Sequence, residues 1–344
     1  MSKDPLLDEL IQNTSKLIDY GEFKKAISLL EENLDLYEDQ YLIFLNLGRA
    51  YLNIEDTQSS IQYLNRALEL LPENLETLEL IGKAYFDARD LDQALASWKR
   101  VVEINEKEYK AWKNIGELYY QMGEYFQATQ AFNNYLEFEE DIEIYSLLAS
   151  IYKKMGNDIE CWNHLMKAEQ LDPDNEKILI QAGETHLDLD NFERAIDYFL
   201  RATNTNPESI PAWFQLGRAF ENKRDFVQAI EAFSKLVEID PENVLGYFHL
   251  ANIYAALANI EDAMRNYEEC LQRDPAFEEA SLSLASLYWA SKKFEKAITY
   301  LSEALRFNNK NRKIYQLLGD IYEDKGEIDK AKENWEIAKI LEEG

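Results

Sequence analysis

Hydrophobic positions along the chain recur every three or four residues, which is the spacing of one face of an α-helix. The stretch of residues 210–243 shows this pattern clearly. Counted from residue 210, positions 4, 7, 8 and 11 form one stripe, and positions 20, 24 and 27 form a second. These positions hold Trp213, Leu216, Gly217, Phe220, Ala229, Phe233 and Leu236. Pro241, at position 32, stops the second helix, so the stretch predicts two helices joined by a turn.

The same two stripes return along the chain with a period of 34 residues. We place the repeats at residues 7–40, 41–74, 75–108, 109–141, 142–175, 176–209, 210–243, 244–277, 278–311 and 312–344. The repeat at 109–141 is one residue shorter, and the deletion falls in an acidic connector. The first repeat has Asn13 and Thr14 where Leu-Gly is usual, so we expect it to be a degenerate N-terminal cap.

This pattern resembles the tetratricopeptide repeat (TPR), a 34-residue helix–turn–helix unit, in the form of a stand-alone bacterial-type TPR array. The resemblance covers nearly everything after residue 6. It implies an all-α fold, an α-solenoid in which about ten TPR helix–turn–helix units form a right-handed superhelix. No unit can bury its two apolar stripes alone, which is the physical reason for the stacking. We therefore expect residues 1–344 to form a single TPR solenoid.

In TPR arrays the first helix of each unit lines a concave groove, and positions 2, 5, 9, 12 and 13 point inward. After residue 210 these positions hold several large apolar groups, which tend to mark contacts when they lie on an exposed surface. We predict a peptide-binding groove formed by Phe214, Arg218, Leu245, Phe248, Asn252, Leu282 and Trp289. The alternative is that one or two of these side chains lean into the core between helices, or that the superhelix covers them.

The inward positions of the middle repeats are charged instead. A secondary groove there comprises Lys110, Lys113, Tyr120, Lys153 and Lys154. The carboxylate clamp of chaperone-binding TPR proteins needs Lys at position 5 and Asn at position 9 of one repeat. Lys113 is followed by Glu117, and Asn252 is preceded by Phe248, so this clamp is absent. Asn252 either pairs with the backbone of an extended peptide or is simply a tolerated polar residue.

The chain is strongly acidic, with 36 Lys and Arg against 65 Asp and Glu and a formal net charge of −29. The charge is spread along the chain, which is typical of a solvated surface, and it disfavours nucleic acid as a partner. No apolar run reaches the length of a membrane span, and the first residues do not resemble a signal peptide. Cys161 and Cys270 lie far apart in the sequence, so we expect buried thiols and a reducing, cytoplasmic location.

Motifs for catalysis or metal binding are absent from the sequence. The three histidines, His164, His186 and His249, lie in different repeats, and none belongs to a His-Glu-x-x-His motif. His186 occupies position 11, where Tyr or Phe usually packs, which favours a core histidine over a ligand. We therefore expect no enzymatic activity, no metal and no cofactor.

These observations favour a non-enzymatic scaffold or adaptor that holds an extended or helical segment of another protein in its concave groove. The acidic surroundings favour a basic flank on that segment. Two alternatives stay open: a self-assembling structural array, and a specificity subunit of a larger complex. Ile337, Ile340 and Leu341 lie near the end of the sequence, which stops at Gly344 without a polar capping helix. We expect weak end-to-end pairing of copies through these apolar residues.

Overall fold

The computed structural model describes residues 5–37 and 40–343, and within these ranges the chain is built from α-helices and one short 3₁₀ turn, without a strand. The first helices of successive pairs are α1 (Pro5–Asp19), α3 (Tyr41–Asn53), α5 (Leu75–Asp87), α7 (Tyr109–Gln121), α9 (Ile142–Lys154), α11 (Glu176–Asp188), α13 (Ile210–Asn222), α15 (Val244–Ala256), α17 (Glu278–Ala290) and α19 (Arg312–Lys325). The second helices are α2 (Phe23–Glu32), α4 (Thr57–Leu70), α6 (Leu91–Ile104), α8 (Tyr125–Leu136), α10 (Asp158–Leu171), α12 (Phe192–Thr205), α14 (Phe226–Ile239), α16 (Ile260–Arg273), α18 (Phe294–Phe307) and α20 (Ile328–Glu343). The 3₁₀ turn (Leu34–Leu36) follows α2. The expectation of an all-α solenoid fold is confirmed.

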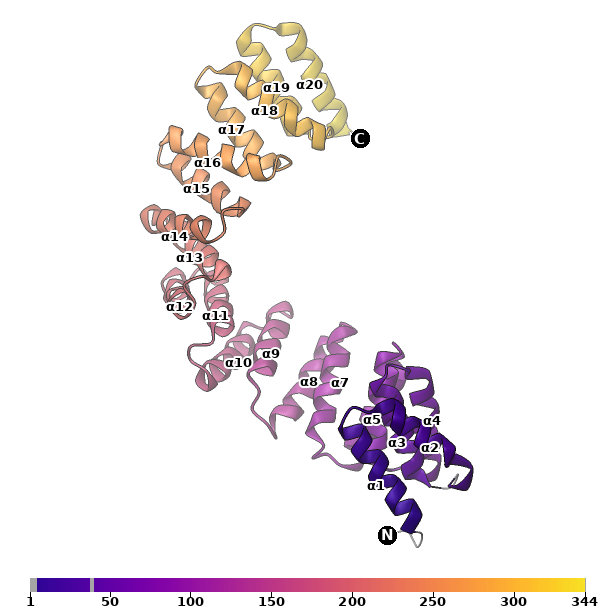
Figure 1. Ribbon diagram of the computed structural model, residues 1–344. Coiled ribbons are helices and arrows are strands. Elements are labelled where there is room, and N and C mark those ends of the chain that lie inside the picture. The colour runs from indigo at the N-terminus through magenta and orange to yellow at the C-terminus, as the bar shows by residue number, and fades with distance from the viewer. Residues whose placement is uncertain (1–4, 38–39, 344) are drawn as a thin grey trace. The chain divides into compact units, whose positions relative to one another are not determined.

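The chain forms two compact units, unit 1 of residues 1–164 and unit 2 of residues 165–344, and the boundary falls within α10. Within each unit the helices follow one another in sequence order, and each packs mainly against its neighbours in the chain (Figure 1). This local packing is the architecture of a repeat array, in which each pair of helices covers the apolar stripe of the next. That all residues form one continuous solenoid stays a prediction.

The two helices of a pair approach closely at position 8, where glycine is frequent. A Cβ atom placed on Gly116 would lie 2.6 Å from the Phe132 ring. The Phe132 side chain, at position 24, is fully buried at this contact. A residue with a side chain at Gly116 would therefore push α7 and α8 apart, which explains why a small residue is needed at position 8.

Helix starts are fixed by side-chain caps in many of the turns. The Asn74 side chain accepts a hydrogen bond from the backbone N–H of Thr77 at 2.8 Å, and the Asp56 carboxylate accepts one from Ser59 at 3.1 Å. Such caps satisfy backbone N–H groups that have no partner within the first helical turn. They fix where α5 and α4 begin, and so set the register of the side chains that follow.

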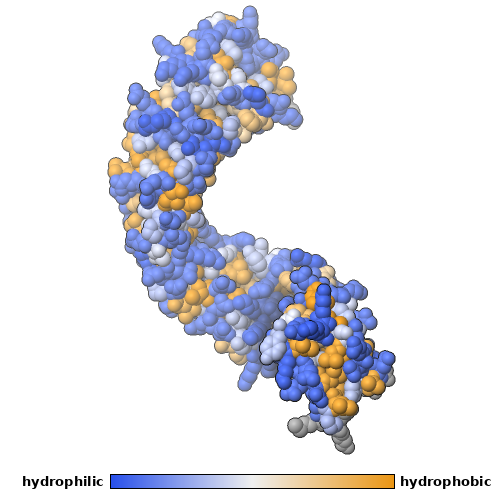
Figure 2. Space-filling model, in the orientation of Figure 1, coloured by the Kyte–Doolittle hydropathy of each residue, from blue (hydrophilic) through white to orange (hydrophobic). Residues whose placement is uncertain are grey.

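The core consists of the apolar stripes together with two cysteines and a histidine that the sequence analysis expected to be buried. Cys161 and Cys270 are both buried, as expected. His186 is buried too, and its ring stacks on that of Tyr198 at a centroid distance of 5.7 Å. Its location in the core confirms the expectation drawn from position 11. Figure 2 shows a largely hydrophilic surface on the visible face, on which hydrophobic residues form separate small groups.

Candidate functional site

The first helices of both units line open cavities, and we call the surface that they form the first-helix face. One cavity of about 770 Å³ in unit 1 lies against α3, α5 and α7. Another of about 830 Å³ in unit 2 lies between α17 and α19. Three further cavities, lined largely by second helices, are smaller, at about 390 to 540 Å³. The roomiest of these concavities therefore lie on the first-helix face.

The unit 1 cavity has an apolar floor and a charged rim. Its lining comprises Arg49, Glu76, Glu79, Leu80, Lys83, Phe86, Asp87, Trp98, Tyr109, Lys110, Lys113, Asn114, Glu117, Tyr135 and Glu139. Lys110 and Lys113 are two of the residues predicted for the secondary groove. The lining from α5 was missed by the sequence analysis, although Glu79, Lys83 and Asp87 stand at positions 5, 9 and 13 of their repeat. Extending the inward-position rule to residues 75–108 would have found them.

Two of the four cations in this cavity are already engaged with carboxylates. Lys113 donates to Asp141 at 2.9 Å, and the Tyr135 hydroxyl donates to the same carboxylate at 3.0 Å. Although burial alone would raise the pKa of Asp141, the hydrogen bonds from Lys113, the Ile144 backbone and Tyr135 lower it. Arg49 lies 3.8 Å from the Glu76 carboxylate. Lys113 therefore fixes the start of α9 rather than standing free in the cavity.

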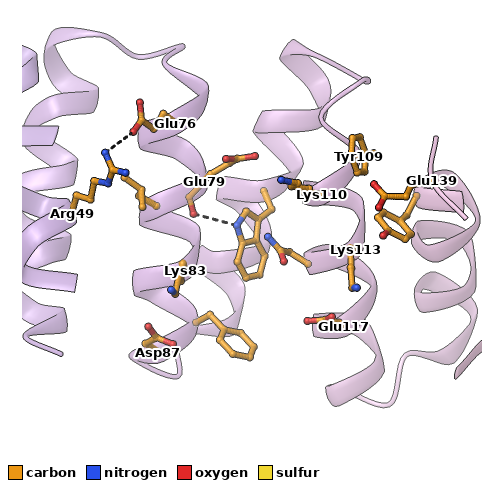
Figure 3. A pocket seen from close by; sticks show the side chains of 15 residues that line it. Arg49, Glu76, Glu79, Lys83, Asp87, Tyr109, Lys110, Lys113, Glu117 and Glu139 are labelled. Atoms are coloured by element: carbon orange, nitrogen blue, oxygen red, sulfur yellow. Dashed lines mark hydrogen bonds and ion pairs between the residues drawn. The ribbon is translucent and has the colours of Figure 1, made fainter. Parts of the chain in front are cut away.

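The carboxylates of Glu79 and Glu117 extend into the space between α5 and α7 (Figure 3). Burial raises the pKa of the Glu79 carboxyl, Glu108 adds to the shift, and Lys110 opposes it. Burial likewise raises the pKa of Glu117, and Lys113 opposes that shift. Both pKa values stay raised because the effect of burial is larger than that of the nearby lysine.

The unit 2 cavity has a different character. Its lining comprises Leu282, Ser283, Ser286, Asn311, Arg312, Lys313, Gln316, Leu317 and Asp320. Leu282, a predicted groove residue, contributes to the apolar part together with Leu317. Arg312 is paired with Glu342 at 2.9 Å, whereas Lys313 is exposed. The cavity thus combines two apolar side chains, Leu282 and Leu317, with charged groups of both signs, Lys313 and Asp320 among them.

Phe214 and Arg218, on α13, lie next to each other, and both are half-buried. The Phe214 ring packs edge-on against Phe233 and His249, at centroid distances of 6.1 and 5.5 Å. The Arg218 guanidinium lies 6.0 Å from the Phe214 ring centre and donates to Gln215 at 3.0 Å. The Phe214 ring therefore leans into the core between helices, which is the alternative that the sequence analysis left open for these positions.

Phe248 and Asn252, on α15, are also half-buried. The Phe248 ring packs against Phe277 at a centroid distance of 4.9 Å. The Asn252 side-chain oxygen accepts a hydrogen bond from the Tyr267 hydroxyl at 2.5 Å. An amide oxygen has two lone pairs, so the Tyr267 bond leaves Asn252 able both to donate and to accept, and both alternatives for this residue stay open.

Leu245 and Trp289 complete the predicted principal groove. Leu245, on α15, is 44% exposed and is the most exposed apolar member of this set. The Trp289 indole N–H donates to the Asp324 carboxylate of α19 at 2.8 Å, and its ring packs against the core of unit 2. Leu245 therefore offers open apolar surface, whereas Trp289 joins two helix pairs.

The remaining members of the secondary groove lie at the ends of two first helices, Tyr120 on α7 and Lys153 and Lys154 on α9. The Lys154 ammonium lies 5.5 Å from the ring centres of both Tyr120 and Tyr125. These cation–π contacts are favourable and connect the end of α9 to the turn between α7 and α8. Lys153 is exposed in the last turn of α9. None of these three predicted residues, Tyr120, Lys153 and Lys154, lines the unit 1 cavity.

On α20, Ile340 is 63% exposed, and Ile337 and Leu341 are half-buried. Gly344, which the sequence analysis also considered, lies outside the described residues.

Within residues 5–37 and 40–343, no helix is long and apolar enough to cross a membrane. The same residues contain no group of three or more His, Cys, Asp or Glu side chains placed to hold a metal ion.

Comparison with protein-family models finds three models described as tetratricopeptide repeat. They match residues 85–151 and 259–321, residues 180–244, and residues 42–74, 142–175 and 313–334. Together these matches span more than half of the chain. No curated protein matches the sequence.

Several solved structures share the fold at low sequence identity. The C-terminal part of a TPR repeat-containing protein from Cytophaga hutchinsonii has a TM-score of 0.63 at 14% identity, covering 70% of this chain and 99% of that one. A tetratricopeptide repeat protein from Parabacteroides merdae has a TM-score of 0.51 at 19% identity, covering 72% and 98%. A chain of the Naa15/Naa10 structure bound to HypK-THB has a TM-score of 0.53 at 14% identity, covering 97% and 63%. These likenesses concern the fold alone.

Proposed function

Because the chain belongs to the tetratricopeptide repeat family, we propose that it is a non-enzymatic scaffold whose first-helix face binds a segment of another protein. The observation that carries the proposal is the position of the two cavities of about 770 and 830 Å³, both on first helices. Side chains at these positions are less constrained by packing than the apolar stripes, so they are available to contact a guest. A bound segment, extended or helical, would lie across successive first helices.

The stretch from residue 210 to residue 290 is our proposed principal site. Leu245 and Leu282 supply accessible apolar surface there, and Arg218 supplies hydrogen-bond donors. Phe214, Phe248 and Trp289 form the half-buried base of this surface. The formal net charge of −29 favours a protein with a basic flank over a nucleic acid, and the two buried cysteines, far apart in the sequence, fit a reducing compartment such as the cytoplasm.

Substitutions at exposed positions test this function without removing core packing. We expect the double variant Leu245→Lys, Lys313→Glu to lose the proteins that co-purify with the tagged wild-type chain, as measured by quantitative mass spectrometry. Loss of a central contact in an interface commonly costs about 2 kcal/mol or more, which corresponds to a roughly thirtyfold weaker affinity. The thermal unfolding midpoint should change little, because both side chains are exposed.

The double variant Val227→Lys, Lys332→Glu is the matched control. It makes the same two charge changes on the second helices α14 and α20, at residues that are also exposed. The control should retain the captured proteins. Equal capture by both variants and the wild type would contradict the proposed function.

A self-assembling array is a second candidate, because Ile340 exposes 63% of its surface on α20. Two copies that cover this face would bury apolar area that otherwise contacts water. The scaffold and the assembly are compatible, since the first-helix face and α20 are different surfaces.

A further inference from the structure

A groove runs along the second helices of unit 1, between α6 and α8. Two cavities of about 410 and 540 Å³ form this groove, and they adjoin because Trp112 and Asn134 line both. Since α6 and α8 both pack against α7, that helix forms the floor of the groove with Trp112 and Tyr119. The lining on the side of α8 runs from residue 127 to residue 138, which corresponds to about 16 Å of helix.

The wall formed by α8 presents amides where the other second helices carry charges. Its sequence, YFQATQAFNNYL, contains no Asp, Glu, Lys or Arg, whereas every other second helix has at least one of them. Gln127, Gln130, Asn133 and Asn134 all line the groove. An amide side chain both donates and accepts hydrogen bonds without carrying a charge. This wall therefore matches the alternating N–H and C=O groups of an extended polypeptide.

Two polar side chains in the middle of the groove have no hydrogen-bond partner in the part of the chain that the structure describes. Trp112 is half-buried, yet its indole N–H donates to no protein group there, whereas the indoles of Trp213, Trp289 and Trp335 each donate to an acceptor. The half-buried Asn134 amide likewise makes no hydrogen bond there. Polar groups that are withdrawn from water usually have a partner, and a guest in the groove would supply one to both.

We propose that this groove binds an extended segment of a partner protein, about five residues long, with an apolar side chain on Trp112. An extended chain advances about 3.3 Å per residue, so five residues match the 16 Å of the α8 wall. The groove is formed by second helices, so this site is separate from the first-helix face and does not rest on the proposed function.

The two ends of the groove differ in charge, which defines the chemistry of the guest further. Lys99 lines one end, with its ammonium 5.4 Å from the ring centre of Tyr119. Glu103, Glu106 and Glu137 line the other end, where the carboxyl ends of α6 and α8 add partial negative charge. A segment with a basic side chain at the glutamate end and an acidic one near Lys99 complements both. A neutral sugar would bond to the amides but would gain nothing from these charges.

The test uses the full chain with nitrogen-15-labelled tryptophan indoles, observed by NMR, and the Trp112→Phe variant identifies the Trp112 signal. The probes acetyl-Lys-Ser-Leu-Ser-Glu-amide and acetyl-Glu-Ser-Leu-Ser-Lys-amide cover both chain directions, and acetyl-Gln-Ser-Leu-Ser-Gln-amide is the neutral comparison. We expect at least one charged peptide to shift the Trp112 signal saturably. At low ionic strength it should bind about fivefold more tightly than the neutral peptide, because two exposed charge pairs form.

Asn134→Leu keeps the approximate shape of the side chain but removes its hydrogen bonds, so it should weaken the affinity for the charged peptide about tenfold. Asn163→Leu is the matched control, because Asn163 is an exposed amide on α10 that does not line the groove. It should leave the affinity unchanged. Glu106→Lys together with Glu137→Lys changes two exposed side chains and should remove the advantage of the charged peptide over the neutral one.

The absence of a saturable shift at Trp112, an unchanged affinity in Asn134→Leu, or equal binding of the charged and neutral peptides to the wild type would each overturn the inference. A Trp112 shift caused by maltotriose and by none of the peptides would overturn it in favour of a sugar site. Leu245→Lys, Lys313→Glu should bind the charged peptide as the wild type does, because neither residue lines this groove. The capture experiment and the peptide titration can therefore fail separately.

Discussion

At the scale of single residues, the turn within a helix pair depends on one backbone conformation. The residue at position 15 has a positive φ in most pairs, and glycine is present in only some of them. The non-glycine residues with this conformation are Glu55, Arg89, Asp190, Arg224, Ala258 and Lys292, with φ between 55 and 64°. A residue with a Cβ atom pays about 1–2 kcal/mol for the left-handed region, whereas glycine does not. These turns therefore hold local strain that the packing of the two helices overcomes.

Ala258→Gly should stabilise the protein by about 0.5–1 kcal/mol, because relief of the left-handed strain exceeds the extra chain entropy of glycine. The position is exposed, so no packing is lost. Thermal unfolding followed by circular dichroism measures the effect. Ala255→Gly, three residues earlier within α15, is the control and should cost about 1 kcal/mol. A loss of stability in Ala258→Gly as large as in this control would show that the turn is not strained.

At the scale of elements, neighbouring helix pairs are joined by a carboxylate shared between two stacked tyrosines. Glu268, on α16, accepts hydrogen bonds from Tyr288 of α17 at 2.5 Å and from Tyr300 of α18 at 3.1 Å. The two rings stack at a centroid distance of 5.8 Å. Unit 1 has the same arrangement, with Glu31 accepting from Tyr51 and Tyr63. Burial and the nearby Glu268 carboxylate raise the pKa of Tyr300 to about 12.

Alkaline pH should destabilise unit 2 through this shared carboxylate. Below the ordinary tyrosine pKa of about 10, both hydroxyls are protonated in the folded and unfolded chains, so the stabilisation is complete. As the pH rises from about 10 toward 12, the unfolded chain loses the Tyr300 proton while the folded chain keeps it, so the free energy of unfolding falls. Tyr300→Phe should lower stability at pH 8 by about 0.5–1.5 kcal/mol and make the unfolding midpoint depend less steeply on pH above 9.

The control for the pH effect is Tyr315→Phe, since the Tyr315 hydroxyl has no hydrogen-bond partner among the described residues. That variant should have nearly the pH dependence of the wild type. If both variants change the alkaline slope equally, the shared carboxylate is not its source.

At the scale of the whole molecule, association and charge oppose each other. The exposed face of α20 favours pairing of copies, whereas a formal net charge of −29 on each chain opposes it. Salt screens this repulsion, because the Debye length falls from roughly 30 Å at 0.01 M to about 8 Å at 0.15 M ionic strength. Any self-association through α20 should therefore grow with ionic strength.

We expect the average mass measured by light scattering to rise with protein concentration at about 0.15 M salt. At about 0.01 M salt it should stay at the mass of one chain at every protein concentration. Ile340→Lys together with Leu341→Lys should abolish the rise, because both changes add charge to the apolar contact. Ile159→Lys is the control, since Ile159 is 74% exposed on α10 and gains the same charge. A monomer at every concentration and salt would refute pairing through α20, and loss of pairing in the control would place the contact elsewhere.

The helices could be predicted from the sequence because their causes are local. Positions 8 and 24 of a pair meet through a turn of a few residues, so the spacing alone brings Gly116 against Phe132. The inward positions followed from the resemblance to TPR arrays, and Lys110, Lys113 and Leu282 do line the cavities of the first-helix face. The contacts that these side chains make in the cavities could not be predicted from the repeat pattern. The period gives the direction in which a side chain leaves its helix axis, but it does not identify the residues that the side chain contacts.

Sequence by itself determined the fold class, the family, the acidity of the surface and the small residues at close helix contacts, because each depends on composition or on neighbours within one period. Tertiary structure decided which side chains stay available to a partner. Lys113 is drawn to Asp141, 28 residues away, and the Phe214 ring leans on His249 of another helix pair. Glu79 and Glu117 instead line one cavity from two helices, and neither carboxylate has an ion pair within residues 5–37 and 40–343. These differences arise because pairing and burial depend on distances between successive helix pairs, and a periodic pattern leaves those distances open.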